Sequence, residues 1–156
     1  MKTIINIKPS IFILIIILFF LPFAQIRCDS TIISEVKGIE FVTGKELKTE
    51  KIDSDAPSKI DPNIYMIFAF ATAIIGLILS FSSKTALLLL NGVVSFAGMT
   101  MLLLFKNNLE TRVVQTEESF GLITVNYQFA YWASLVLFIL YGLFSLSLIL
   151  SKKAAE

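Results

Sequence analysis

Side chains that could carry catalysis or bind a metal are few, and they lie in the polar stretches of this sequence. There is no histidine, which removes the commonest general base and the commonest metal ligand. Cys28 is the single cysteine, so neither an intrachain disulfide nor a cysteine-based zinc site can form. Asp53, Asp55 and Asp61 offer carboxylates for calcium, but their spacing matches no ordered calcium loop. A solvated run of charges is the favoured interpretation.

The nearest approach to convergent catalytic acids is Glu117 and Glu118, opposite the acidic stretch 53–61. Convergent acids or bases at one membrane face would mark a membrane-embedded enzyme, and this pair is too isolated to support one. The sequence therefore predicts a protein that is not an enzyme, with no catalytic, cofactor-binding or metal-binding residue and no cofactor.

Composition indicates a membrane protein of one domain, 1–156. Hydrophobic residues make up 56% of the chain and charged residues 16%, whereas soluble domains carry roughly 25% charged residues. The net charge of +1 gives no electrostatic reason for binding nucleic acid, so none is expected as a partner. The lipid bilayer is the expected environment.

Four uncharged apolar segments are candidate membrane spans. The central two, 63–82 and 86–105, are separated by a short polar turn at Lys84 and predict an antiparallel hairpin. Each is about 20 residues long, enough to cross a hydrocarbon core of roughly 30 Å. The outer two are 10–26 and 129–150, and the latter is followed by a short cytoplasmic tail, 151–156. Asp61, Pro62 and Asn63 carry the chemistry expected at the start of a helix.

The first apolar segment has two interpretations. A basic start, a short apolar run and a small residue after it are typical of a signal peptide. The same features describe a first span or signal anchor with its N-terminus inside. We favour this interpretation because the residues ending at Ala24 and at Cys28 match the small-x-small pattern of a cleavage site poorly. Lipidation of Cys28 is disfavoured because Ile26 and Arg27 precede it where small residues are required.

The two long connections, 27–62 and 106–128, both contain strand signals. The first predicts a β-hairpin over 31–43, with strands 31–36 and 39–43 around a turn at Lys37 and Gly38. The rest of that connection, 45–58, is charged and predicts a mobile loop.

In the second connection, strands are expected at 111–115 and 122–127, with Gly121 ending the loop between them. Isolated hairpins are marginal in water, so we expect the two connections to share one antiparallel sheet. Burying a side chain such as Val113 or Ile123 between them contributes roughly 1.5–3 kcal/mol.

Orientation follows from the positive residues near the helix ends. Lys2, Lys8, Lys84, Lys152 and Lys153 all fall on one side of a four-span topology, which the positive-inside rule makes cytoplasmic. The expected fold class is an α-helical integral membrane protein: a four-helix transmembrane bundle carrying a small extracytoplasmic antiparallel β-sheet from the two long loops. This shape resembles that of claudins, although the tryptophan and paired cysteines of their first loop are missing here.

Small residues repeat at helical spacing in the two central spans and predict close helix packing. Internal packing is favoured over a docking face for another membrane protein. Asn91 is the most polar residue of the spans and is expected to join helices, with a pore or ligand pocket as the alternative. The predicted helix-packing set is Ala69, Ala73, Gly76, Ser80, Asn91, Ser95 and Gly98, and the predicted interfacial aromatic belt is Tyr127, Phe129, Tyr131 and Trp132.

No charged residue lies inside any of the four segments, which argues against pumps and ion-coupled transporters. The sequence favours a non-enzymatic accessory or assembly subunit that contacts a protein partner, or a second copy, through its external β-cap and small-residue helix faces. The alternative is an oligomeric passive channel or small-solute carrier with a polar path of Ser80, Asn91, Ser95 and Thr100.

The segment from Leu21-Pro22-Phe23 through Cys28 to the stretch TGKEL at 43–47, ahead of a Pro-Asn helix start, is similar to a group of small bacterial four-span membrane proteins without assigned function. The resemblance touches short stretches only. It implies the same topology and a location in the bacterial inner membrane as a multi-pass protein, and it implies no activity.

Overall fold

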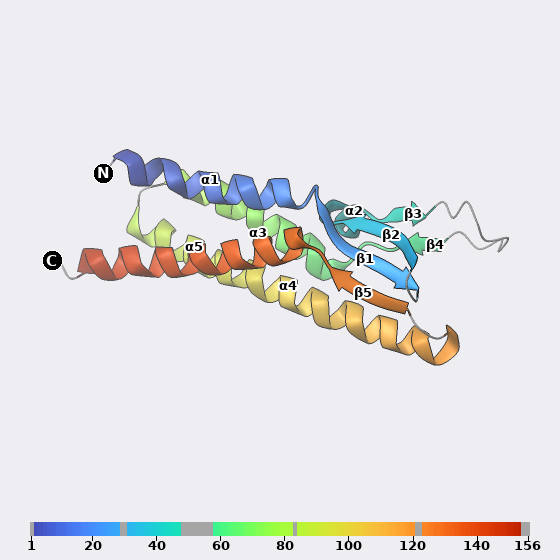
Figure 1. Ribbon diagram of the computed structural model, residues 1–156. Helices are drawn as coiled ribbons and strands as arrows, with labels where there is room; N and C mark the ends of the chain where they lie inside the picture. Colours follow the sequence, from blue (N-terminus) through green and yellow to red (C-terminus); the bar gives the residue numbers. More distant parts are fainter. Residues whose placement is uncertain (1, 29–30, 48–57, 83, 121–122, 154–156) are drawn as a thin grey trace.

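The computed structural model describes residues 2–28, 31–47, 58–82, 84–120 and 123–153. Among these residues the fold is mostly helical, and Figure 1 shows long helices side by side with the strands at one end. Helices α1 (Lys2–Leu18) and α4 (Thr85–Phe120) each pack against both α3 (Ile64–Ser80) and α5 (Phe129–Lys153). α1 begins, α5 ends and α3 connects to α4 at the end of the bundle opposite the strands.

Two helices are long and apolar enough to cross a membrane: 86–111 within α4 and 129–151 within α5. The apolar parts of the other two are shorter, Pro9–Leu18 in α1 and Ile64–Ser80 in α3. The helix start predicted at Asp61-Pro62-Asn63 is observed, because Asn63 caps α3 and its side-chain oxygen accepts a hydrogen bond from the Tyr65 amide at 3.0 Å.

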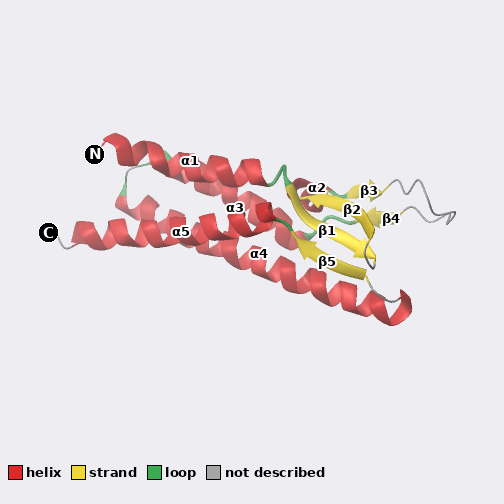
Figure 2. Ribbon diagram, viewed as in Figure 1, coloured by secondary structure: helices red, strands yellow, loops and turns green. Residues whose placement is uncertain are grey.

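A three-stranded antiparallel sheet sits on one end of the bundle (Figure 2). Strand β1 (Pro22–Cys28) is central, with β2 (Thr31–Lys37) on one side and β5 (Ile123–Tyr127) on the other. The expectation that the two connections share a sheet is confirmed, because β2 of the first connection and β5 of the second both pair with β1. The strand that joins them, however, is not one of those predicted.

The first apolar helix ends earlier than the predicted 10–26, since the last residues of that stretch form β1. Pro22 accounts for this change, because the residue before a proline avoids the helical region. α1 ends at Leu18, and Leu21 closes a turn by donating its amide to the Leu18 carbonyl at 2.9 Å. The chain therefore leaves the bundle as a strand.

The predicted hairpin over 31–43 is wrong in its second half. Strand β2 pairs with β1, and the following residues form a short helix, α2 (Gly38–Thr43). The amides of Gly38 and Ile39 donate to the Leu21 and Phe19 carbonyls, at 3.3 and 2.7 Å. The carbonyls of the turn that follows α1 thus gain partners at the start of α2.

The predicted strand at 111–115 is also wrong, because α4 continues without a break to Phe120. The β-branched residues Thr111, Val113 and Val114 favour a strand locally. Extending an existing helix adds one hydrogen bond for each residue fixed, whereas a new hairpin needs its own nucleus. Thr111 also satisfies its hydroxyl inside the helix by donating to the Asn107 carbonyl at 2.8 Å.

The stretch predicted as a mobile loop, 45–58, is partly ordered. Strands β3 (Lys45–Leu47) and β4 (Ser58–Ile60) form a separate two-stranded antiparallel sheet, and 48–57 lie outside the described residues. Gly44 adopts a φ of 82° between α2 and β3. A side chain there would be strained and would lie 3.1 Å from the Ile60 carbonyl oxygen.

Aromatic side chains join the cap, defined as β1, β2, α2 and β5, to the helices. Phe41 of α2 packs edge-on against Phe105 of α4, with ring centres 4.9 Å apart. Phe23 of β1 meets Tyr131 of α5 at 6.1 Å, and all four rings are buried. Such aromatic pairs contribute about 0.5–1.5 kcal/mol beyond the area they bury, so the cap is fixed to the bundle at two separate points.

The β1–β5 register can be tested with paired cysteines in a Cys28→Ser background. Gln25 lies directly opposite Asn126, so Gln25→Cys with Asn126→Cys should oxidise to an intrachain disulfide. In the matched control, Gln25→Cys with Val125→Cys, the two thiols point to opposite faces and should stay reduced. Gel mobility with and without reductant measures both. Equal oxidation of the two pairs, or of neither, would contradict this register.

Candidate functional site

The small residues predicted for helix packing lie inside the bundle. Ala69, Ala73, Gly76 and Ser80 are buried along one face of α3. The ring of Phe12 from α1 packs directly onto Gly76, where a Cβ atom would come within 2.2 Å of the ring. The absent side chain is thus what lets α1 approach α3 closely.

The predicted packing residues of α4 form the contact with α5. Asn91, Ser95 and Gly98 are all buried. A Cβ atom on Gly98 would lie 2.6 Å from the Phe138 ring, and the Ser95 hydroxyl donates to the Phe138 carbonyl at 2.7 Å. These residues therefore make their packing contacts within the chain.

Side-chain hydroxyls form a ladder of hydrogen bonds to backbone carbonyls along the seam between α4 and the segment β5–α5. Ser145 donates to the Leu88 carbonyl at 2.7 Å, and Ser95 donates in the other direction, to α5. Further along, Tyr131 donates to the Leu102 carbonyl at 3.1 Å. The last rung, from Tyr127 to the Lys106 carbonyl at 3.2 Å, lies beside the sheet. Sequence reasoning missed this ladder, whose donors come from α4, β5 and α5.

Asn91 lies at the point where three helices meet. Its side-chain nitrogen donates to the Tyr141 hydroxyl of α5 at 2.8 Å and to the Ser80 hydroxyl of α3 at 3.1 Å. The Ser80 hydroxyl in turn donates to the Gly76 carbonyl at 2.7 Å. The Asn91 oxygen is buried without a partner among the described residues. Asn91 therefore cross-links α3, α4 and α5.

The four residues of the predicted polar path are not arranged as a path. Ser80, Asn91 and Ser95 are buried inside one chain and hydrogen-bonded there. Thr100 is exposed and donates to the carbonyl of Phe96 in its own helix. A path between chains would need these groups on a shared outer face, so the arrangement gives the channel interpretation no support.

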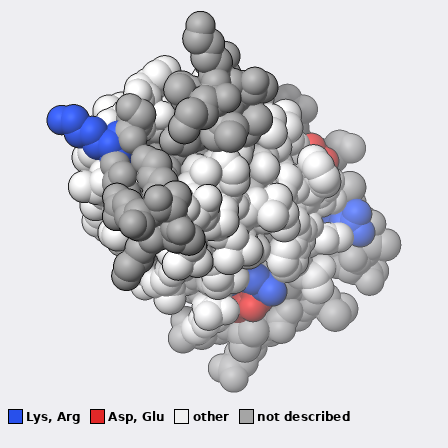
Figure 3. Space-filling view, turned by 90° about the vertical axis from the view of Figure 1, so that its left-hand side faces the viewer, with Lys and Arg blue, Asp and Glu red and all other residues white. Residues whose placement is uncertain are grey.

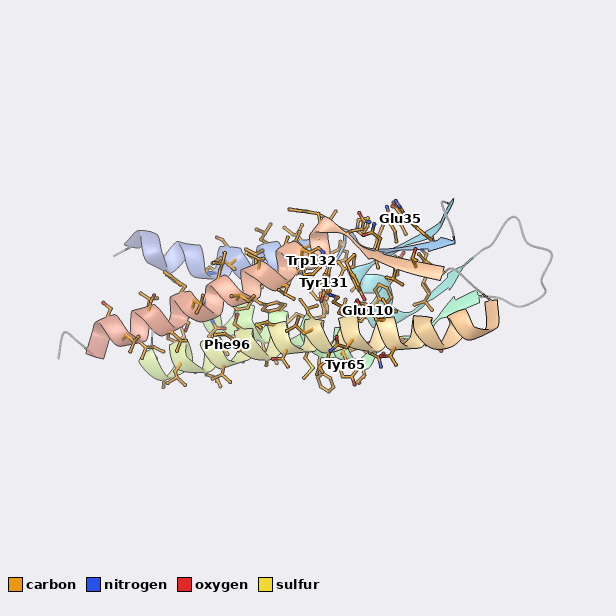
Figure 4. The ribbon with its side chains drawn as sticks, turned by 60° about the horizontal axis from the view of Figure 1, so that its bottom comes forward. Glu35, Tyr65, Phe96, Glu110, Tyr131 and Trp132 are labelled. Atoms are coloured by element: carbon orange, nitrogen blue, oxygen red, sulfur yellow. The ribbon has the colours of Figure 1, made fainter. Side chains whose placement is uncertain are left out.

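The predicted aromatic belt divides into inner and outer members. Tyr131 is fully buried and Tyr127 is half-buried, whereas Phe129 and Trp132 are 78% and 45% exposed. Figure 4 shows Tyr131 and Trp132 together at the start of α5. Phe129 and Trp132 are the two that face outward, as side chains at a membrane interface do.

Sequence reasoning also missed a cation beside this belt. The Lys106 ammonium lies 5.3 Å from the centre of the Trp132 ring and 5.8 Å from that of Tyr127. Glu110 pairs with Lys106 at 3.8 Å, one helical turn further along α4. Burial, and secondarily the Glu110 charge, raises the pKa of the Tyr127 phenol, which therefore stays a neutral donor to the Lys106 carbonyl.

The outer face of the sheet is polar. Glu35, Gln25 and Asn126 form one row across β2, β1 and β5. The Gln25 amide donates to Glu35 at 2.5 Å, and Arg27 donates to Gln25 at 3.4 Å. The Arg27 Nε atom is buried without a partner among the described residues. Figure 4 shows Glu35 on this sheet, away from the helices.

No cluster of three or more metal-ligating side chains occurs within the described part of the chain. Asp61 is exposed ahead of α3, whereas Asp53 and Asp55 lie outside the described residues. Glu117 and Glu118 belong to α4 and not to the loop predicted for them.

The fold defines a predominantly helical protein in which two helices have membrane-spanning length and a small sheet caps one end. Comparison of the chain with protein-family models, curated proteins and solved structures finds no match. Its function must therefore be inferred from its own contacts.

The hydrogen-bond ladder can be tested with two serines of α5. Ser145→Ala removes the bond to the Leu88 carbonyl and should lower the free energy of unfolding by about 0.6–1.7 kcal/mol. Ser147→Ala is the matched control, since this exposed hydroxyl bonds only to Phe144 in its own helix. Titration of the purified protein with a denaturing detergent measures both. Equal stability of the two variants would contradict a stabilising role for the ladder.

Proposed function

We propose that this chain is a multi-pass membrane protein in which α1, α3, α4 and α5 all cross the bilayer. The support is a belt of large apolar side chains that stay exposed on every one of these helices. Ile17 of α1 is 53% exposed and Ile78 of α3 is 65% exposed, as are comparable residues of α4 and α5. Exposed apolar area on this scale would be a liability in water and is normal in lipid.

The two shorter helices are included in this proposal, α3 by its length and α1 by its packing. The 17 residues of α3 extend about 26 Å, close to the roughly 30 Å hydrocarbon core, whereas the apolar part of α1, Pro9–Leu18, extends about 15 Å. Phe12 and Ile15 of α1, and Phe19 directly after it, are fully buried. Removing α1 would uncover their partners, which supports its retention as a first span over its removal as a signal peptide.

The proposed orientation places both termini and the α3–α4 connection in the cytoplasm and the cap outside. Lys2, Lys8, Lys84, Lys152 and Lys153 support it, because they cluster at the helix ends opposite the sheet. Figure 3 views the bundle from that end, where the described side chains are mostly uncharged and a few charged groups lie among them. A bacterial inner membrane is the location that the short sequence resemblance suggests.

Within that membrane we assign the chain the role of a non-enzymatic accessory or assembly subunit. The observation that carries this assignment is the cap: its central strand is paired on both sides and its helix α2 is anchored on Phe105. The cap thus holds the polar row of Glu35, Gln25 and Asn126 in a fixed geometry outside the membrane. Preordered hydrogen-bonding groups lower the entropic cost of binding a protein partner or a second copy.

Orientation can be measured by cysteine labelling in a Cys28→Ser background. Glu35→Cys places a thiol on the exposed cap, and Lys84→Cys places one on the exposed α3–α4 connection. In right-side-out vesicles, a membrane-impermeant maleimide should label Glu35→Cys and leave Lys84→Cys unlabelled until the membrane is permeabilised. Inverted vesicles should give the opposite pattern. Labelling of both from one side would contradict the four-span topology.

Partner binding can be measured by affinity capture in mild detergent. The wild-type chain should recover a stoichiometric partner or a stable homo-oligomer. Replacing Gln25, Glu35 and Asn126 together by alanine should abolish recovery, since these side chains point away from the core. Ser147→Ala serves as the control and should behave as wild type. An inert monomer from the wild-type chain would contradict the proposed role.

A further inference from the structure

An apolar groove of about 540 Å³ runs between α1 and α5 on the outer surface of the bundle. The α5 side of the groove is one helical face, with residues at spacings of three and four. Several of its lining side chains are about half exposed, so α1 does not cover this face. The groove is lined by Leu14 and Leu18 of α1 and by Phe129, Trp132, Ala133 and Val136 of α5, among others.

One polar side chain lies where the groove meets the cap. A second, mainly apolar hollow of about 210 Å³ shares Phe129 with the groove and is lined by Leu21, Pro22, Gln128 and Ala130. The side-chain amide of Gln128 makes no hydrogen bond to another described residue, and its backbone amide donates to the Phe23 carbonyl at 2.8 Å. The apolar groove thus leads to one polar side chain at the level where α5 begins.

A positive charge lies at the same level. The Lys106 ammonium sits over the Trp132 ring, and Trp132 is also a wall of the groove. Its pairing with Glu110 is long, at 3.8 Å, and both side chains are partly exposed. Exposed pairs of this kind are weak, so donors of the ammonium remain free for an anionic group.

We infer that this groove binds one glycerophospholipid, with an acyl chain between α1 and α5 and the phosphate beside Lys106. Trp132 separates the two parts of the ligand, as interfacial tryptophans separate acyl chains from headgroups. The inference rests on the proposed membrane location of the chain. It extends that proposal by assigning a particular lipid site on the outer half of the bundle.

The size of the lining residues favours an acyl chain over a helix of a partner or second copy. Helices that pack in lipid meet through small residues, as Gly76 and Gly98 do inside this bundle. The groove presents Phe129, Trp132 and Leu14 instead, which would hold a second backbone away. A flexible chain can follow the space between such side chains, and the adjacent cation complements its phosphate.

The single tryptophan of the sequence makes the site directly observable. The full-length protein in detergent micelles would be titrated with phosphatidylglycerol carrying brominated acyl chains, which quench nearby tryptophan fluorescence. Quenching of Trp132 should saturate at a single equivalent of lipid. Quenching that rises in proportion to the lipid fraction, without saturation, would overturn the site and leave only the ordinary lipid shell.

Two variants test the two parts of the site. Ala133→Phe fills the groove and should raise the half-saturating lipid concentration roughly tenfold, the loss expected from excluding about two methylene groups. Its control is Ala86→Phe, an equal enlargement on an exposed position of α4. Lys106→Gln should weaken phosphatidylglycerol binding roughly fivefold and leave phosphatidylcholine binding unchanged. Its control, Lys84→Gln, changes an exposed lysine at the other end.

The outcomes separate this inference from the proposed topology. Unchanged binding by Ala133→Phe together with Val136→Phe would overturn the groove, even where cysteine labelling confirms the four spans. Competition by inorganic phosphate without an acyl chain would assign a simple anion site to Lys106 and also overturn it. A wrong labelling pattern with saturable quenching would instead reject the topology and leave the lipid site standing.

Discussion

Hydrogen bonds from side chains to backbone carbonyls hold α4 against α5, and the position of every other element depends on that seam. Between Leu88 and Lys106, five residues of α4 are hydrogen-bonded to α5 or β5. Each of these polar groups would be costly if left open in an apolar medium, so their pairing specifies one alignment of the two helices. Asn91 extends the same constraint to α3 through Ser80.

The seam also determines where the cap can form. Its last rung joins Tyr127 to Lys106, and the strand β5 that precedes α5 is thereby placed beside α4. β1 can then pair with β5, and α2 fills the space between the sheet and Phe105. The helices and the cap therefore form one packed unit, and a binding surface on the cap would be held with the rigidity of the bundle.

The helix faces have two different uses. Inward faces carry glycine, serine and alanine, which allow phenylalanine rings and backbones to approach closely. Outward faces carry large apolar residues and, near the cap, the groups Trp132 and Lys106. This division matches the proposed lipid surroundings, and it leaves the polar outer row of the sheet as the surface suited to a protein partner.

The sequence by itself determined the approximate positions of the four apolar helices, the cap of α3 at Asn63 and the apolar character of the surface, because these follow from local composition and periodicity. It also indicated that the two connections meet in one sheet, since their apolar residues need cover.

Only the tertiary structure decided which strands pair. The first helix ends at Leu18 and a strand begins at Pro22, and 39–43 become helical where the Ile39 amide bonds to the Phe19 carbonyl beside the end of α1. Residues 111–115 stay helical because α4 was already nucleated. Those choices depend on partners distant in the sequence, as do the Asn91 cross-link and the groove beside Trp132.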